Sequence, residues 1–119
     1  MRRISIIIGV MLPLLFASCG QQKEAEQLIE EFIDHNAITP AKIENRTFQK
    51  IDSTKNISDS LVIAMQERSH ELFKESIEYP IKISGRMLYF IRMNYTYEGD
   101  TLSQTFYIDE SFKDIVAFK

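Results

Sequence analysis

Apolar and polar residues follow two different periods along this chain, and these periods predict its helices and strands. Residues 23–35 carry an apolar stripe at helical spacing with acidic residues on the opposite side, which predicts a first helix. Residues 59–78 show a second, broader apolar face and predict a helix that begins after an N-cap at Ser58 and is closed by Pro80. The first stripe consists of Ala25, Leu28, Ile29, Phe32 and Ile33, and the second face of Leu61, Val62, Met65, Leu72, Phe73 and Ile77.

From Ile81 onward the period changes to two residues, which is typical of strands. A long strand, kinked at Ser84-Gly85, leads through a hairpin turn at 98–100 to a return strand over 101–109. A turn at 110–113 precedes a final strand over 114–118. A stretch with weaker alternation, residues 46–52, predicts one more strand, and Thr39-Pro40 predicts the start of a brief helical turn between it and the first helix.

The order of these elements indicates the fold class. Two amphipathic helices need an apolar surface to cover, and the antiparallel strands offer one. We therefore expect an α+β domain in which both helices pack on one face of a curled antiparallel sheet of three to four strands. This element order is similar to that of cystatin-like and NTF2-like folds, an analogy that concerns order alone, because no motif supports it.

Residues 1–18 have the layout of a secretory signal peptide. A positive start, Met1-Arg2-Arg3, is followed by an apolar run from Ile4 to Phe16. This run is shorter than the roughly 20 residues that a membrane-spanning helix needs. A retained membrane anchor is the alternative interpretation, and the shortness of the run disfavours it.

The residues Phe16-Ala17-Ser18-Cys19 resemble the lipobox of bacterial lipoproteins: an apolar residue, two small residues and a cysteine, with Phe16 where the family usually has Leu. The resemblance implies cleavage before Cys19 by signal peptidase II and attachment of diacylglycerol and a fatty acid such as palmitate to that cysteine. Gly20 stands where Asp signals retention in the inner membrane of some bacteria, so the resemblance implies the outer membrane, on its periplasmic face or at the cell surface. Residues 19–22 would be a short tether and residues 23–119 one globular domain.

Charge and cysteine content narrow the class of partner. Removal of Arg2 and Arg3 with the signal peptide takes the formal net charge from −3 to −5. An acidic domain lacks the basic footprint of a nucleic-acid-binding protein and is repelled by anionic lipid, so the lipid on Cys19 would have to hold it at the membrane. Cys19 is the only cysteine, so no disulfide forms within one chain.

The candidate chemistry is sparse and predicts no enzyme. Glu31 with His35, and Glu67 with His70, have spacings that place carboxylate and imidazole together on a helix, and we expect solvated helix faces there. Each pair offers fewer ligands than the three or four of a stable metal site. Ser69, His70 and Glu71 have the residue types of a catalytic triad, but consecutive helical residues point in different directions. We expect no catalytic residue, no metal and no cofactor.

Two sets of residues remain as candidate surface features. Tyr95, Tyr97 and Tyr107 are candidates for an exposed aromatic surface that binds a sugar or a protein partner; the alternative is that they pack beneath the helices. Ser53, Ser60 and Thr101 follow aspartates in pairs that resemble the Asp-Ser/Thr sequon of some bacterial O-glycosylation systems; the alternative is that such pairs suit turns and caps.

Three functions are compatible with these features. The first is a non-enzymatic binding or accessory module that holds an envelope protein or glycan at the membrane surface. The second is an inhibitor or immunity-type lipoprotein that blocks a secreted enzyme or toxin, since an acidic module suits a basic target. The third is a small-ligand-binding domain or enzyme with a pocket between sheet and helices, which a deep pocket containing His70, Arg92 and acidic groups would favour.

Overall fold

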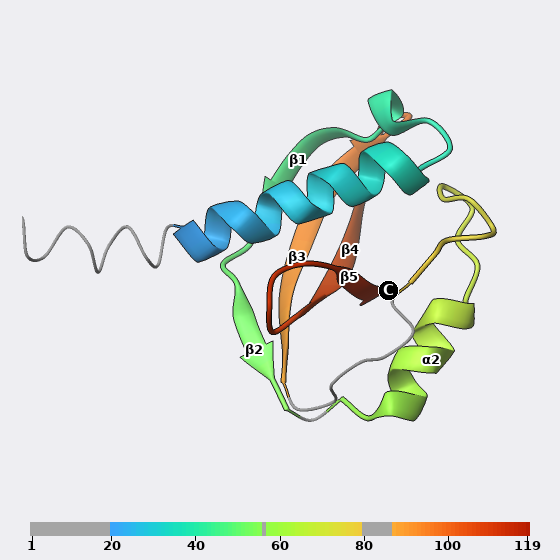
Figure 1. The fold of residues 1–119 in the computed structure, drawn as a ribbon. Helices are drawn as coiled ribbons and strands as arrows, with labels where there is room; N and C mark the ends of the chain where they lie inside the picture. The colour runs from blue at the N-terminus through green and yellow to red at the C-terminus, as the bar shows by residue number, and fades with distance from the viewer. Residues whose placement is uncertain (1–19, 56, 80–86) are drawn as a thin grey trace, which may run out of the picture.

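The computed structural model describes residues 20–55, 57–79 and 87–119, so the signal peptide, Cys19 and the Ser84-Gly85 kink lie outside the described residues. Two α-helices pack on a curled antiparallel sheet, which confirms the α+β class (Figure 1). None of the helices in the described ranges is long and apolar enough to cross a membrane. A helix over residues 20–36 is followed by η1 (Pro40–Lys42), β1 (Glu44–Phe48), β2 (Asp52–Thr54), α2 (Asp59–Glu67), β3 (Leu88–Tyr97), β4 (Asp100–Asp109) and β5 (Ile115–Phe118).

The sheet is built around the β3–β4 hairpin. These strands pair without interruption from Leu88 opposite Asp109 to Tyr97 opposite Asp100. Glu98 and Gly99 form the turn, and both have positive φ, 50° and 87°, as a two-residue type I′ hairpin requires. The order along the sheet is β1-β3-β4-β5, and β2 pairs with β3 beyond β1.

The single strand expected over 46–52 is two strands, so that prediction is wrong in its continuity. Between the two strands, backbone groups bond to the side chain of Gln22. Gln22 Nε2 donates to the Gln49 carbonyl at 3.0 Å, and Oε1 accepts from the Ile51 N–H at 2.7 Å. These contacts join the first turns of the N-terminal helix to the connector between β1 and β2.

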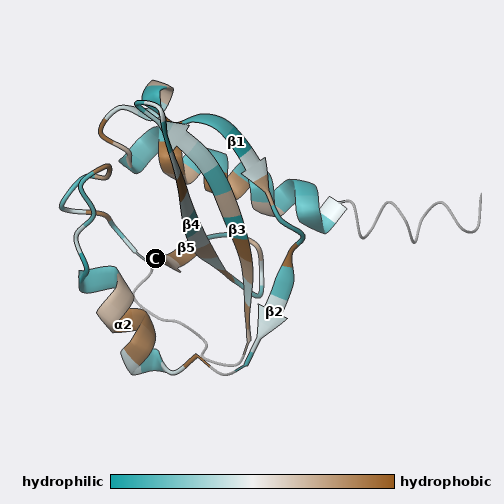
Figure 2. Cartoon of the chain, turned by 180° about the vertical axis from the view of Figure 1, so that it is seen from behind, coloured by the Kyte–Doolittle hydropathy of each residue, from teal (hydrophilic) through white to brown (hydrophobic). Residues whose placement is uncertain are grey.

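The two helices cover opposite faces of the sheet, which corrects the expectation that both lie on one face. Pleated strands present alternate residues to alternate faces. The N-terminal helix packs on the face of Ile91 and Phe106; it crosses in front of β3 and β4 in Figure 1 and behind them in the reverse view of Figure 2. Helix α2 packs through Val62 and Met65 on the other face, together with Leu88, Tyr107, Val116 and Ala117.

Helix α2 is much shorter than the sequence predicts. Ser58 caps it as expected, accepting a hydrogen bond from the Leu61 N–H, but the helix ends at Glu67. The apolar residues that extend the periodicity, Leu72 and Phe73, are buried on the face of the N-terminal helix instead.

Hydrogen bonds to the end of the N-terminal helix hold the segment after α2 in this position. The Ile38 N–H donates to the Leu72 carbonyl at 2.9 Å, and the Lys74 N–H donates to the Asn36 carbonyl at 2.8 Å. The segment 68–79 therefore carries the chain from one face of the sheet to the other.

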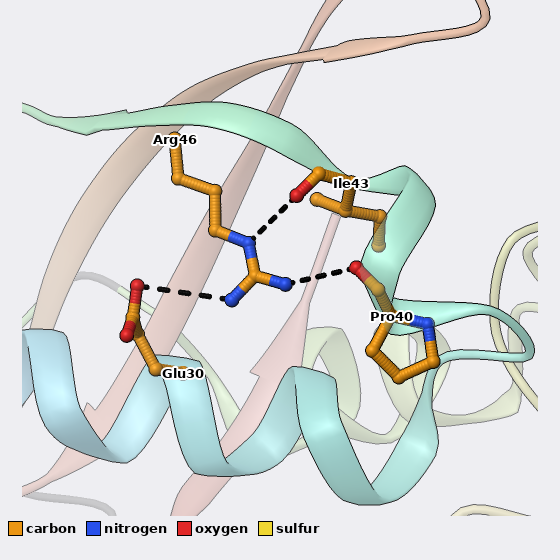
Figure 3. A network of polar contacts seen from close by, with 4 residues as sticks. All are labelled: Glu30, Pro40, Ile43 and Arg46. Carbon is orange, nitrogen blue, oxygen red and sulfur yellow. Dashed lines mark hydrogen bonds and ion pairs between the residues drawn. The ribbon is translucent and has the colours of Figure 1, made fainter.

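Arg46 joins the N-terminal helix, η1 and β1 (Figure 3). Its Nε donates to the Ile43 carbonyl at 2.9 Å and its Nη2 to the Pro40 carbonyl at 3.0 Å. Its Nη1 lies 3.7 Å from a carboxylate oxygen of Glu30 on the N-terminal helix. The planar guanidinium thus satisfies two carbonyls around η1 and faces the helix with its remaining edge.

Asp109 holds the turn between β4 and β5. Its Oδ1 accepts from the backbone N–H groups of Lys113 and Asp114, and its Oδ2 accepts from the Ser111 hydroxyl. Burial raises the pKa of this carboxyl, but the hydrogen bonds outweigh burial and the pKa is lowered overall.

Candidate functional site

A pocket of about 260 Å³ lies where three parts of the chain meet. Two of its lining residues are cationic, three carry neutral polar groups and one is an aromatic ring. They are Arg68, Ser69, His70, Gln104, Phe118 and Lys119.

Each part of the chain is fixed by backbone contacts. Arg68, Ser69 and His70 directly follow α2, where the helix ends. Gln104 lies on β4. Phe118 is the last residue of β5, and Lys119 continues the pairing, with its N–H and carbonyl both bonded to Thr105 at 3.0 and 2.8 Å.

His70 is half-buried against aromatic rings, so the expectation of a solvated helix face is wrong for it. Its ring centroid lies 5.4 Å from that of Phe73, nearly perpendicular, and 6.0 Å from that of Phe118. The Leu72 N–H donates to Nδ1 at 3.2 Å. Because Nδ1 accepts, the neutral imidazole carries its proton on Nε2.

The side-chain amide of Gln104 lies between His70 and Tyr95 and is buried. Its Nε2 is 2.8 Å from His70 Nε2 and donates to the Tyr95 hydroxyl at 3.2 Å, while Oε1 has no hydrogen-bond partner in the described part of the chain. If the amide of Gln104 is turned over, its Oε1 faces His70 and accepts from the protonated Nε2 of the imidazole. One end of the amide stays unpaired in either orientation.

The ionisation of this network follows from its burial. Burial lowers the pKa of His70, and the nearby carboxylate of Glu71 offsets this only in part. Burial also raises the pKa of Tyr95, against the effect of the hydrogen bond with Gln104. At neutral pH the imidazole and the phenol are therefore both uncharged.

The charge of the pocket comes from Arg68 and Lys119, which are both exposed. Neither makes an ion pair with a carboxylate of the described residues. The side chains that line the pocket include no acidic group. The pocket thus combines two exposed cationic side chains with a neutral interior.

Comparisons with protein-family models, with curated proteins and with solved structures find no match. The analogy with cystatin-like and NTF2-like folds therefore stays a prediction about element order. Function has to be argued from the geometry of the chain itself.

The three tyrosines do not form one exposed surface, so that interpretation is wrong. Tyr95 is 1% exposed and Tyr107 is 6% exposed, and they lie in the apolar clusters on opposite faces of the sheet. Tyr97 is half-buried on the face of the N-terminal helix. The tyrosines are core residues, as their strand positions also allow.

The pocket that His70 lines contains neither Arg92 nor an acidic side chain, the residues that would favour the third function. Arg92 is exposed on β3 and donates to the hydroxyl of Ser103 at 2.9 Å. Its even position on the strand places it on the face opposite Tyr95. The arginine that lines this pocket is Arg68.

The pair Glu31 and His35 lines a second, shallower hollow, on the N-terminal helix. There His35 Nδ1 lies 2.9 Å from the Glu31 backbone carbonyl. Within residues 20–55, 57–79 and 87–119, no three side chains converge as metal ligands.

The residues of the Asp-Ser/Thr pairs lie at the surface, where their modification stays a prediction. Ser53 on β2, Ser60 in the first turn of α2 and Thr101 on β4 are all exposed. The Asp52 side chain accepts from the Ser53 N–H at 2.8 Å, a local contact typical of Asp-Ser pairs in turns.

Proposed function

We propose that this protein is a small lipoprotein of the bacterial outer membrane that acts as a non-enzymatic binding module at the membrane surface. The lipobox-like residues 16–19 support the lipid anchor. The observation that carries the proposal in the structure is that the domain is already folded at residue 20, so a lipid on Cys19 would leave almost no free tether.

The contacts of Gln22 support this close seating. Its amide binds the backbone on both sides of Lys50, which fixes the start of the helix to the body of the domain. Residue 20 is therefore part of a helix held by tertiary contacts, and a lipid attached one residue earlier would hold this end of the domain against the bilayer. The partner would then be membrane-bound itself or small enough to approach the membrane surface.

The pocket beside His70 supports binding as the activity. Its cations, its amide and its aromatic ring are groups that hold and orient a ligand. Ser69 and His70 are neighbours in sequence, and His70 uses Nδ1 to accept from the Leu72 backbone and Nε2 to contact Gln104, so its imidazole is engaged in the fold.

Fatty-acid labelling in cells tests the lipid anchor. Cys19→Ala should abolish incorporation of labelled palmitate and leave the signal peptide uncleaved by signal peptidase II. Ser18→Ala is the matched control, because it keeps a small residue before the cysteine and should be labelled like the parent chain. Equal labelling of the Cys19→Ala chain would refute the lipoprotein assignment.

A lengthened tether tests the close seating. About 15 Gly/Ser residues inserted after Gly20 would free the domain from the bilayer by tens of ångströms while keeping Gln22 in place. Cross-linking in intact envelopes should then lose its membrane-bound partner, while the thermal unfolding midpoint stays that of the parent chain. If the lengthened chain still cross-links to its partner and keeps the parent unfolding midpoint, close approach to the membrane plays no part in partner binding.

A further inference from the structure

We propose that the pocket beside His70 binds a small organic acid: a single carboxylate on a short apolar body. This names a ligand class for the proposed binding function and rests on that function, but not on the lipid anchor. The observations that carry it are the two exposed cations, which form no ion pair with a carboxylate of the described residues, the neutral interior and the size of the pocket.

The cations select the sign of the ligand. Arg68 and Lys119 reach the pocket from different parts of the chain, one after α2 and the other after β5. A guanidinium presents two parallel N–H donors that match the geometry of a carboxylate, and a lysine adds a mobile positive charge. Glu71 lies close enough to His70 to affect its pKa but does not line the pocket.

The interior selects the body of the ligand. The ring of Phe118 is stacked on Phe106 with centroids 5.7 Å apart, so it forms a fixed apolar wall. The imidazole of His70 stands beside it and is neutral. A volume of about 260 Å³ lies just below the usual range for drug-sized ligands, so it suits a body the size of one ring.

The amide of Gln104 gives the pocket a polar group that the fold does not satisfy. It is 7% exposed, and one of its ends has no partner in the described part of the chain. A buried polar group without a partner is costly, and contact with a polar ligand atom or a water that accompanies it would remove this cost.

The test is an NMR titration of the full chain in nonionic detergent with benzoate as the probe. Benzyl alcohol and benzylamine are matched controls that keep the ring and change the charge. Benzoate should give saturable shifts of the backbone amides of residues 68–70 and 118–119, and bind about tenfold more tightly than either control. Shifts that do not saturate, or equal binding of benzyl alcohol, would overturn the proposal.

Variants locate the site. Arg68→Gln and Lys119→Gln should each weaken benzoate binding about fivefold or more, and Arg68→Lys should weaken it less than Arg68→Gln. Lys50→Gln removes the same charge from the distant β1–β2 connector and should bind like the parent chain. An equal loss of benzoate affinity in Lys50→Gln would show that binding depends on net charge only and would refute the site. Unchanged NMR resonances of β3 and β4 establish that each variant is folded. Because Cys19 takes no part, failure here leaves the labelling result standing, and failure of labelling leaves this result standing.

Discussion

Gln22 accepts a hydrogen bond from the backbone N–H of Ile51 at 2.7 Å, across 29 positions of sequence. The same amide donates to the Gln49 carbonyl. Through these two contacts the side chain of Gln22 takes the place of a neighbouring strand for the connector between β1 and β2. It thereby fixes the end of the molecule that would face the bilayer.

Replacement of Gln22 by alanine should therefore destabilise the fold. The two hydrogen bonds to the connector are lost together with the one that Gln22 donates to the Glu26 carboxylate at 2.9 Å, while helix propensity improves slightly. We therefore expect a cost of about 1–2 kcal/mol in the free energy of unfolding, measured by urea denaturation. Gln21→Ala, at the exposed neighbouring position, is the control and should be close to neutral. Equal effects of the two substitutions would mean that the Gln22 contacts contribute nothing.

Arg46→Lys should cost about 1–3 kcal/mol in the free energy of unfolding. A lysine cannot reach the Ile43 and Pro40 carbonyls with a planar fork, so at least one half-buried hydrogen bond is lost. Glu30→Gln separates the ion pair from these bonds. Its 3.7 Å contact is with a half-exposed carboxylate, so that variant should lose less than about 1 kcal/mol. The reverse ranking would place the stabilisation in the ion pair.

His70 should make stability depend on pH. Its pKa in the folded chain is below the ordinary value of 6.5, so the unfolded chain takes up the proton more readily, and the contribution of His70 is lost as pH falls below 6.5. His70→Phe keeps an aromatic ring and removes the hydrogen bonds. It should cost about 1–2 kcal/mol at pH 7.5, and less at pH 5.

The control for this pH dependence is Ser69→Ala, whose stability should run parallel to that of the parent chain between pH 7.5 and pH 5. A stability difference between the parent chain and His70→Phe that stays constant over this range would show that His70 is not desolvated by the fold.

The turn of the central hairpin offers a stabilising change. Glu98 has φ of 50°, a conformation that asparagine adopts more readily than glutamate. Glu98→Asn should raise the free energy of unfolding by a few tenths of a kcal/mol to about 1 kcal/mol, even though it removes the exposed ion pair with Lys42. Gly99→Ala is the opposing test: φ of 87° is unfavourable for alanine, so a lower melting temperature is expected.

The strongly periodic parts of the fold could be predicted from the sequence. The stripe of the first helix and the alternation through β3 and β4 are local patterns, and most of their apolar residues are buried as the period indicates, whereas Leu102 is 38% exposed. The sequence pattern predicts too long a helix α2, because Leu72 and Phe73 keep the helical period past residue 67. What ends the helix is tertiary: the backbone at 72 and 74 bonds to residues 38 and 36, which no local pattern shows.

The candidate site was harder to predict, and the available signals were small. Gln104 stands among Leu102, Phe106 and Ile108 on one side of a predicted strand, and an amide in an apolar row is a sign of a buried polar contact. The parity of the same strand places Tyr107 opposite Phe106, which separates it from Tyr95. The position of Arg68 in the pocket could not be predicted from the sequence, because it depends on the end of α2 at Glu67, before the predicted end.

The surface that the N-terminal helix covers is encoded near the other end of the chain. Residues 25–33 become buried against β3, β4 and β5, which begin at Leu88 and are synthesised last. During synthesis or export that starts from the N-terminus, the apolar side of this helix has no native surface to rest on until the central hairpin has emerged. Interruption before Leu88 would leave this apolar side uncovered, a condition that favours aggregation.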